Sequence, residues 1–289
     1  MKMIEQMIKK YNLGDITGDI LPLSGGLMHK MFKVQTSTGT YAVKHLNPEI
    51  MKRPGVMENY KKAEALEKIL EDNNISIVGR NLKINTILFD MYGVILCESK
   101  GNFIPYTYTH FDQSEYDRIT GLFKEKMLFT RAALGEMTSD EFLTQLGYAN
   151  PHFHMMDYID NYLTLDEGFI TFAEKYASLY DFVLLSNDVS EWSEYITEHH
   201  GLNRYFKHKI VSGDVKCRKP DRKIYEIALE TIGKSPEECI FVDNSVKNLR
   251  VAGELGIQSI LFNRDKEEYE GVVVNSFEEL AELISEKYG

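Results

Sequence analysis

The sequence predicts an α/β protein: a doubly wound, Rossmann-like parallel sheet with an inserted helical cap, preceded by a small α+β segment. Short apolar runs lead directly into polar residues at Asp90, Ser186 and Asp243. Helical patterns alternate with such runs through residues 180–289, whereas residues 99–179 show helical spacing without strand patterns. Strands that alternate with helices are typical of parallel sheets, so we expect the helical stretch to be an insertion between two strands.

Composition narrows the class of protein. The chain has 289 residues, of which 43% are hydrophobic, and a formal net charge of −11, which argues against a general nucleic-acid binder. Its three cysteines are scattered without C-x-x-C spacing and indicate reduced thiols rather than disulfides or a zinc site. Neither a signal peptide nor an apolar run of membrane-spanning length is present, so we expect a cytoplasmic protein without membrane or nucleic-acid partners.

We predict two domains, residues 1–80 and 81–289, with a boundary near Gly79 and the polar Arg80-Asn81. In the second domain, residues 81–98 and 180–289 form the core and residues 99–179 the cap. In the first, apolar spacing indicates a helix, three strands and a second helix, at residues 1–11, 20–23, 29–36, 40–46 and 59–71.

This order of elements resembles the small lobe of protein-kinase-like enzymes, and in detail the aminoglycoside and choline phosphotransferase branch. The similar strings are L-S-G-G-L-M-H-K-M-F-K-V and Y-A-V-K-H-L-N-P. The resemblance implies that Lys44 would bind nucleotide phosphates, with Glu64 as its partner and Gly25-Gly26 covering the phosphates. It ends near residue 75, and no catalytic-loop pattern follows. We therefore expect a truncated lobe with a structural or regulatory role rather than a working kinase.

The stretch I-N-T-I-L-F-D-M-Y-G-V, residues 84–94, has the pattern of a buried parallel strand that ends in a carboxylate and a glycine turn. In open parallel sheets, chemistry takes place outside the carboxyl ends of the strands. If the three apolar strands are neighbours, Asp90, Ser186 and Asp243 converge there with Lys219 from a loop. Two adjacent carboxylates repel each other and recruit a cation, and a few oxygen ligands suit Mg²⁺ with a substrate phosphate. This constellation predicts phosphoryl transfer with Asp90 as the nucleophile.

Four strings resemble the motifs of the haloacid dehalogenase-like hydrolase superfamily, in the right order over residues 82–265. They are F-D-M-Y-G-V, L-L-S-N, R-K-P-D-R-K-I-Y and I-F-V-D-N-S-V-K-N-L-R-V-A-G-E-L-G. The resemblance implies that Asp90 is the nucleophile, that Ser186, Asn187 and Lys219 bind the phosphate, and that Asp90, Asp243 and the backbone carbonyl of Tyr92 bind Mg²⁺. The insertion point after Val94 is similar to that of the helical-cap subgroup.

Tyr92 departs from the phosphatase pattern, in which a second aspartate at this position acts as general acid and base. A tyrosine, with an ordinary pKa near 10, can donate a proton but is a poor base at neutral pH. The same D-x-Y pattern is similar to that of the haloacid dehalogenases, where aspartate attacks carbon and no metal is needed. Asp243 instead favours the metal-binding version, because a second acid beside Asp90 is costly without a cation.

We therefore expect a Mg²⁺-dependent phosphatase that hydrolyses a small phosphorylated metabolite through an aspartyl-phosphate on Asp90, slowly because of Tyr92. A metal-independent 2-haloacid dehalogenase is the first alternative. The second is a ligand-binding or regulatory module with impaired catalysis. Cap residues, Arg131 among them, are candidates for substrate contacts, although nothing in their spacing selects one.

Overall fold

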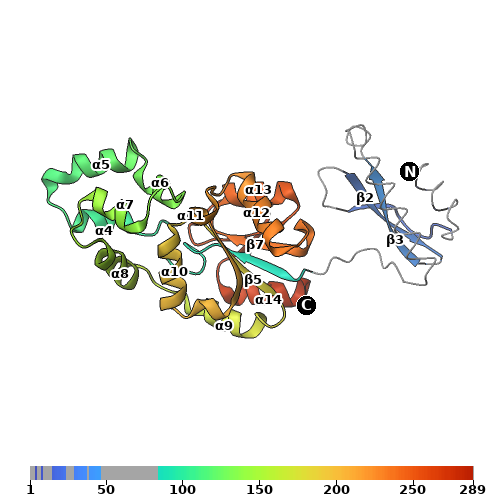
Figure 1. Ribbon diagram of the computed structural model, residues 1–289. Coiled ribbons are helices and arrows are strands. Elements are labelled where there is room, and N and C mark those ends of the chain that lie inside the picture. Colours follow the sequence, from blue (N-terminus) through green and yellow to red (C-terminus); the bar gives the residue numbers. More distant parts are fainter. Residues whose placement is uncertain are drawn as a thin grey trace. The chain divides into compact units, whose positions relative to one another are not determined.

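The chain folds into two compact units, residues 1–81 and 82–289 (Figure 1). The computed structural model describes residues 4, 8, 15–23, 29–37, 39–46 and 84–288.

The N-terminal unit contains a three-stranded antiparallel sheet in the order β1-β2-β3. The strands lie where the sequence predicts them, at Leu21–Leu23, His29–Thr36 and Gly39–Leu46. Val34 of β2 is fully buried and packs with Ile4 and Ile8, so a small apolar core covers one face of this sheet.

Most of the residues that carry the kinase resemblance lie outside the described part of the chain. Lys44 pairs with Met31 in the register of β2 and β3, but its side chain is not among the described parts. Gly25, Gly26, Glu64 and the predicted helix at residues 59–71 also lie outside the described residues. The kinase-like character of this unit stays a prediction.

The C-terminal unit is built on a six-stranded parallel sheet, which confirms the predicted α/β class. Its strand order is β6-β5-β4-β7-β8-β9, so the strand before Asp90 lies in the middle. The strands are Thr86–Phe89 (β4), Asp181–Ser186 (β5), Phe206–Val211 (β6), Cys239–Asp243 (β7), Gln258–Phe262 (β8) and Val272–Val274 (β9).

Helices cover both faces of this sheet, and the strands are therefore apolar along nearly their whole length. Within β4, Ile87 and Phe89 join the core on one face and Leu88 joins the core on the other. The first face is covered by α9 (Glu167–Tyr176), α10 (Ser190–His199) and α14 (Phe277–Lys287). The second is covered by α12 (Arg222–Ile232) and α13 (Val246–Leu255).

The inserted segment forms the cap, whose helices gather away from the sheet (Figure 1). They are α4 (Phe103–Thr109), α5 (Tyr116–Lys124), α6 (Leu128–Ala133), α7 (Ser139–Leu146) and α8 (Pro151–Tyr162). The predicted capping box opens α7, with Thr138 and Glu141 exchanging side-chain and backbone hydrogen bonds. Helix α9 instead packs on the sheet, because the rings of Phe169 and Phe172 lie against Phe89. The cap therefore ends before α9.

Short elements complete the unit: α11 (Ser212–Val215) and the 3₁₀ turns Gln113–Glu115, Leu202–Arg204 and Pro236–Glu238. The cap is fastened to the core through α10 and α11. The indole Nε1 of Trp192 donates to Ser139 Oγ at 2.7 Å, and Ser212 Oγ donates to the carbonyl of Ala133 at 2.6 Å.

Among the described residues, no helix combines the length and apolar character that crossing a membrane requires.

Candidate active site

Asp90 directly follows the central strand β4, and its position is fixed by the two neighbouring strands. In the sheet register, Phe89 lies beside Leu184 of β5 and Val242 of β7. The backbone N–H of Asp90 donates to the carbonyl of Val242 at 3.0 Å. The ends of β4, β5 and β7 therefore meet at one edge of the sheet, as the sequence predicts.

Lys219 connects the two carboxylates at this edge. Its Nζ lies 2.7 Å from Asp90 Oδ1 and 2.9 Å from Asp243 Oδ2, and it donates to the carbonyl of Leu185 at 2.7 Å. The side chain of Lys219 is only 1% exposed, so these contacts lie in a poorly solvated region where charge interactions are strong. The ammonium therefore supplies a counter-charge for both acids.

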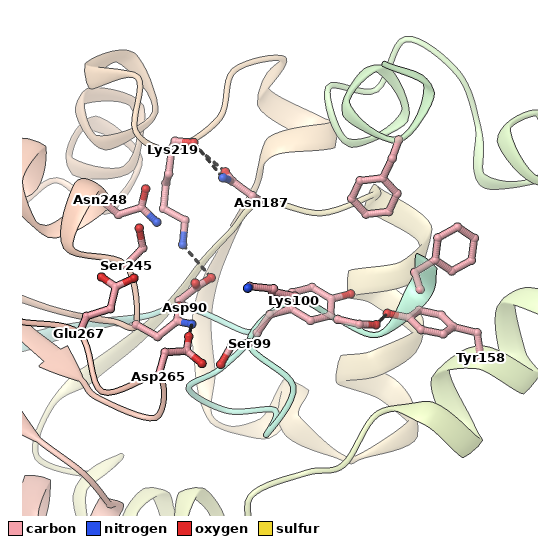
Figure 2. Close-up of a pocket in the computed structure, with 15 residues that line it drawn as sticks. Asp90, Ser99, Lys100, Tyr158, Asn187, Lys219, Ser245, Asn248, Asp265 and Glu267 are labelled. Atoms are coloured by element: carbon pink, nitrogen blue, oxygen red, sulfur yellow. Dashed lines mark hydrogen bonds and ion pairs between the residues drawn. The ribbon is translucent and has the colours of Figure 1, made fainter. Parts of the chain in front are cut away.

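The loop that carries Lys219 is held by Asn187. The side-chain amide of Asn187 donates to the carbonyl of Lys219 at 2.9 Å and accepts from its N–H at 2.8 Å (Figure 2). These two bonds join the end of β5 to the loop before α12. They align the lysine backbone, so that its side chain extends toward Asp90.

Burial and the ion pair between Asp90 and Lys219 shift the pKa values of these two groups in opposite directions. Burial raises the pKa of Asp90 to about 7, although Lys219 lowers it, and the nearby Asp243 raises it further. For Lys219, burial lowers the pKa, but Asp243 and Asp90 more than offset this, and the net pKa lies above its ordinary value. The lysine stays charged near neutral pH.

Asp243 is more enclosed than the sequence predicts. Its side chain is fully buried and lies outside the lining of the pocket. Oδ1 accepts from the backbone N–H of Ser245 at 2.7 Å, and both oxygens accept from the Asn248 amide. The cation that compensates this second acid in the structure is the ammonium of Lys219. The repulsion between the two neighbouring carboxylates is therefore compensated within the protein, and it does not by itself require a metal ion.

A pocket of about 320 Å³ opens onto Asp90. Asp90, Asn187 and Lys219 line it (Figure 2). Tyr92 lines it as well, so the pocket brings together four of the predicted site residues. The cap contributes aromatic side chains, and loops after the strands contribute polar ones. The other lining residues are Ser99, Lys100, Gly101, Phe103, Phe129, Tyr158, Asn244, Ser245, Asn248, Asp265 and Glu267. Arg131 is not among them, and it pairs with Glu136 at 2.8 Å instead.

Ser186, at the end of β5, is fully buried and does not line the pocket. Its hydroxyl has no hydrogen-bond partner within the described part of the chain. A buried hydroxyl without a partner is uncommon in proteins, so this one is a candidate for a role outside the fold itself.

Asp188 is a site residue that the motifs did not reveal. It is fully buried, and its Oδ2 accepts from the hydroxyls of Ser193 at 2.8 Å and Tyr92 at 3.2 Å. Burial raises the pKa of Asp188 to about 7, against the lowering effect of these hydrogen bonds. Burial also raises the pKa of Tyr92, and Asp188 raises it further, so the phenol stays protonated. The signal in the sequence is its place two residues after Ser186, in S-N-D.

The donor set admits a magnesium ion, but not in the arrangement expected from the sequence. Asp90 Oδ1 is occupied by Lys219 and by the N–H of Met91, whereas Oδ2 accepts no hydrogen bond from any described residue. One carboxylate oxygen with water and a substrate phosphate is a common way to hold Mg²⁺. For Asp243 to be a direct ligand, Lys219 would have to release its Oδ2.

Comparisons with known proteins agree with this geometry. The family model of haloacid dehalogenase-like hydrolases matches residues 84–256. An (S)-2-haloacid dehalogenase of Burkholderia cepacia is 31% identical over 112 residues, which cover 37% of this chain and 48% of the relative. A D-ribitol-5-phosphate phosphatase of Bacteroides thetaiotaomicron is 24% identical over 196 residues, covering 61% of this chain and 90% of the relative.

A solved structure has the same fold. It is a family enzyme from Bacteroides thetaiotaomicron in complex with magnesium and inorganic phosphate, with a TM-score of 0.54 and 22% identity over 65% of this chain and 98% of that one. The chain spans about half the length of the dehalogenase named above. The family model, by contrast, covers more than half of this chain, including the strands that end at Asp90, Ser186 and Asp243. The chain belongs to the haloacid dehalogenase-like hydrolases.

Proposed function

We propose that this protein is a Mg²⁺-dependent phosphatase that hydrolyses a small phosphate monoester through an aspartyl-phosphate on Asp90. The observation that carries the proposal is the state of the Asp90 carboxylate. One of its oxygens is fixed by Lys219 and the Met91 N–H, while the other accepts no hydrogen bond from the described residues and the side chain lines the pocket. A nucleophile held at one oxygen and unbonded at the other is oriented for attack.

The charge of the pocket supports the need for a divalent cation. Asp90, Asp265 and Glu267 line it against two ammonium groups, those of Lys100 and Lys219, and Asp243 lies beneath. Negative charge therefore exceeds positive charge, and a phosphate dianion would be repelled without a further cation. Asp90 Oδ2 and the carbonyl of Tyr92 are the groups that would hold Mg²⁺, which when bound neutralises phosphate charge. The magnesium and phosphate in the related enzyme also support this assignment.

In the reaction, Asp90 attacks phosphorus with the oxygen that would not hold Mg²⁺, while the bond to the leaving oxygen breaks. Lys219, with the Asn187 side chain nearby, would stabilise charge on the transferring phosphoryl group. Tyr92 would give its hydroxyl proton to the leaving group. Water then cleaves the aspartyl-phosphate and releases inorganic phosphate. Proton donation by a phenol whose pKa lies above its ordinary value is unfavourable near neutral pH, and we therefore expect slow turnover.

A panel of small phosphate monoesters, with an aryl phosphate as a general probe, tests the proposal. We expect turnover with Mg²⁺ that is lost in EDTA and in the Asp90→Asn variant. Asp214→Asn is the matched control, since this exposed carboxylate on α11 does not line the pocket. Turnover that persists in both EDTA and Asp90→Asn would overturn the proposal.

A metal-independent 2-haloacid dehalogenase is the second candidate, and two observations favour it. Lys219 compensates both Asp90 and Asp243 without a metal, and Tyr92 occupies the second position after the nucleophile. In this case Asp90 would displace halide from carbon and form an ester that water cleaves. Halide release from 2-chloropropionate in EDTA would establish this reaction. A blank result with active phosphate turnover would exclude it.

A further inference from the structure

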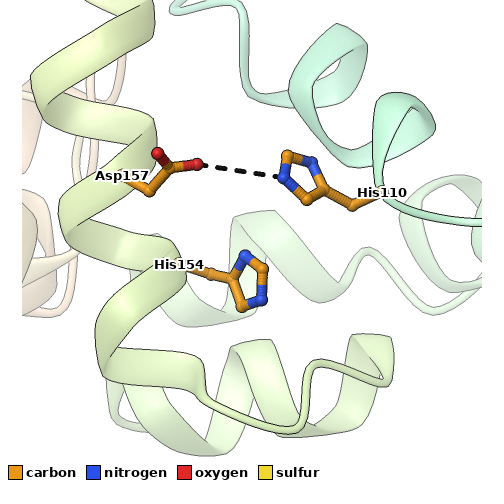
Figure 3. Close-up of side chains that lie close together, drawn as sticks. All are labelled: His110, His154 and Asp157. Atoms are coloured by element: carbon orange, nitrogen blue, oxygen red, sulfur yellow. Dashed lines mark ion pairs between the residues drawn. The ribbon is translucent and has the colours of Figure 1, made fainter.

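Two histidines and one aspartate lie close together in the cap, and none of them lines the pocket at Asp90. His110 is the residue that ends α4, while His154 and Asp157 lie one turn apart on α8 (Figure 3). One ligand atom from each lies within 4.8 Å of the other two. The side chains of His110 and Asp157 are 28% and 27% exposed, so an ion in solution can reach them.

The ring of His110 is oriented by the backbone. Its Nδ1 lies 2.9 Å from the carbonyl oxygen of Tyr106, which can only accept a hydrogen bond. Nδ1 therefore carries the hydrogen, and in the neutral ring Nε2 carries the lone pair. That Nε2 lies 3.8 Å from Asp157 Oδ2 and points toward it (Figure 3). Histidines that bind metals usually donate their other ring N–H to a carbonyl or carboxylate in this way.

The other two side chains both contact the hydroxyl of Tyr106. Its buried hydroxyl lies 2.9 Å from His154 Nδ1 and donates to Asp157 Oδ2 at 3.0 Å. The amide of Asn161 donates to the second oxygen, Asp157 Oδ1, at 3.0 Å. A neutral imidazole is the form that binds metal ions.

We propose that His110, His154 and Asp157 form a binding site for a divalent transition-metal ion of the Zn²⁺ class, with water as the remaining ligand. Two imidazole nitrogens and one carboxylate are a common three-residue set for zinc and for Co²⁺ or Ni²⁺. Magnesium and calcium prefer oxygen ligands and fit this set poorly. The site is thus separate in place and in ligand chemistry from the proposed magnesium site at Asp90.

Such an ion would tie α4 to α8, the two helices that supply Phe103 and Tyr158 to the pocket. Tyr106 links the two places, since its ring lies 6.0 Å from that of Phe103 and 5.5 Å from that of Tyr158, measured between centroids. The ion would stabilise this aromatic wall without touching the substrate. We assign it a structural role in the cap.

The test is a titration of the full chain with Co²⁺ and with Zn²⁺, in excess Mg²⁺, followed by visible absorption and by calorimetry. We expect one ion per chain with a cobalt spectrum of nitrogen and oxygen ligands. Binding of this ion, and with it the cobalt spectrum, should be abolished in each of the variants His110→Ala, His154→Ala and Asp157→Asn. His152→Ala is the matched control, because this histidine is exposed on the same helix outside the cluster. Tyr106→Phe keeps all three ligands and should weaken binding by roughly 10–100-fold.

Absence of stoichiometric binding by the unaltered chain would overturn the proposal whatever the variants do. So would binding that is unchanged in the three ligand variants, or a cobalt spectrum with intense thiolate bands, which would place the ion at a cysteine. Circular dichroism of each variant shows whether a loss of binding reflects loss of the cap helices. Asp90→Asn should bind Zn²⁺ normally, which separates this site from the proposed hydrolytic function.

Discussion

Lys219 and Asp90 form an ion pair of 2.7 Å in which the lysine is almost completely buried. The same ammonium contacts Asp243 at 2.9 Å. One buried cation therefore compensates two acids that follow adjacent strands. This relationship determines how the site behaves when any of the three charges is removed.

Lys219→Met tests that relationship. It leaves Asp90 and Asp243 near each other without a counter-charge, and breaking a buried ion pair costs roughly 3–5 kcal/mol. We expect a loss of this order in the free energy of unfolding, measured by urea denaturation, and loss of hydrolysis. Lys223→Met, an exposed lysine on α12, should change neither. Equal stability of the two variants would contradict the assigned role of Lys219.

Ser186→Ala separates a structural hydroxyl from a functional one. Because Ser186 Oγ has no partner in the described residues, removing it should leave the free energy of unfolding unchanged or raise it by about 1 kcal/mol. If the hydroxyl serves the phosphate, kcat/KM should fall by roughly 10-fold or more, since hydrogen bonds to charged groups contribute about 1.5–3 kcal/mol. Unchanged kcat/KM would show that Ser186 does not act on substrate.

Tyr92→Asp tests whether phosphate turnover is slow only because position 92 lacks an efficient general acid and base. An aspartate there supplies a general acid and base, a role worth roughly 10²–10⁴-fold in rate. We expect a large rise in kcat for an aryl phosphate, measured by steady-state kinetics. Tyr92→Phe, which removes only the hydroxyl that donates to Asp188, should not gain activity. A fall in kcat with Tyr92→Asp would argue that the tyrosine is itself suited to the reaction.

Asp188→Asn tests the effect of the buried carboxyl on stability. The pKa of Asp188 is raised by burial from 3.8 to about 7, so the folded state holds the proton more tightly than the unfolded state. Its contribution to stability is therefore present at low pH and is lost as pH rises from about 4 through 7. Asparagine cannot ionise and escapes this loss.

The free energy of unfolding of Asp188→Asn, relative to that of the unaltered protein, should therefore increase as the pH rises from about 4 through 7. A pKa shift of about three units corresponds to an increase of up to ~4 kcal/mol. Urea denaturation at pH 5 and pH 8 measures it. Asp214→Asn, an exposed carboxyl on α11, serves as the control. A difference that does not vary with pH would contradict the raised pKa.

The sheet and the convergence of its strand ends could be predicted, because short apolar runs that end in polar residues and alternate with helices are typical of parallel strands. Asp90, Asn187 and Lys219 line one pocket, as the predicted sheet requires. The partners of Asp243 could not be predicted. Sequence order places two acids near each other but does not say that Lys219 reaches between them.

The sequence also could not predict which residues of the loops and of the cap approach the pocket. Asp188, Tyr158 and Asp265 approach the pocket only through the backbone path of their segments, which apolar periodicity does not encode. The end of the cap was misplaced for a similar reason. Helix α9 has the same helical spacing as the cap helices, and only its packing on Phe89 shows that it covers the sheet.

The proposed reaction passes through a covalent aspartyl-phosphate on Asp90. The most direct measurement is mass spectrometry of the acid-quenched protein during turnover of an aryl phosphate with Mg²⁺, followed by digestion. We expect one added phosphoryl group on the peptide that contains Asp90, absent in Asp90→Asn and in EDTA. Turnover of the substrate with no modification of that peptide, or with the phosphoryl group on another residue, would contradict it.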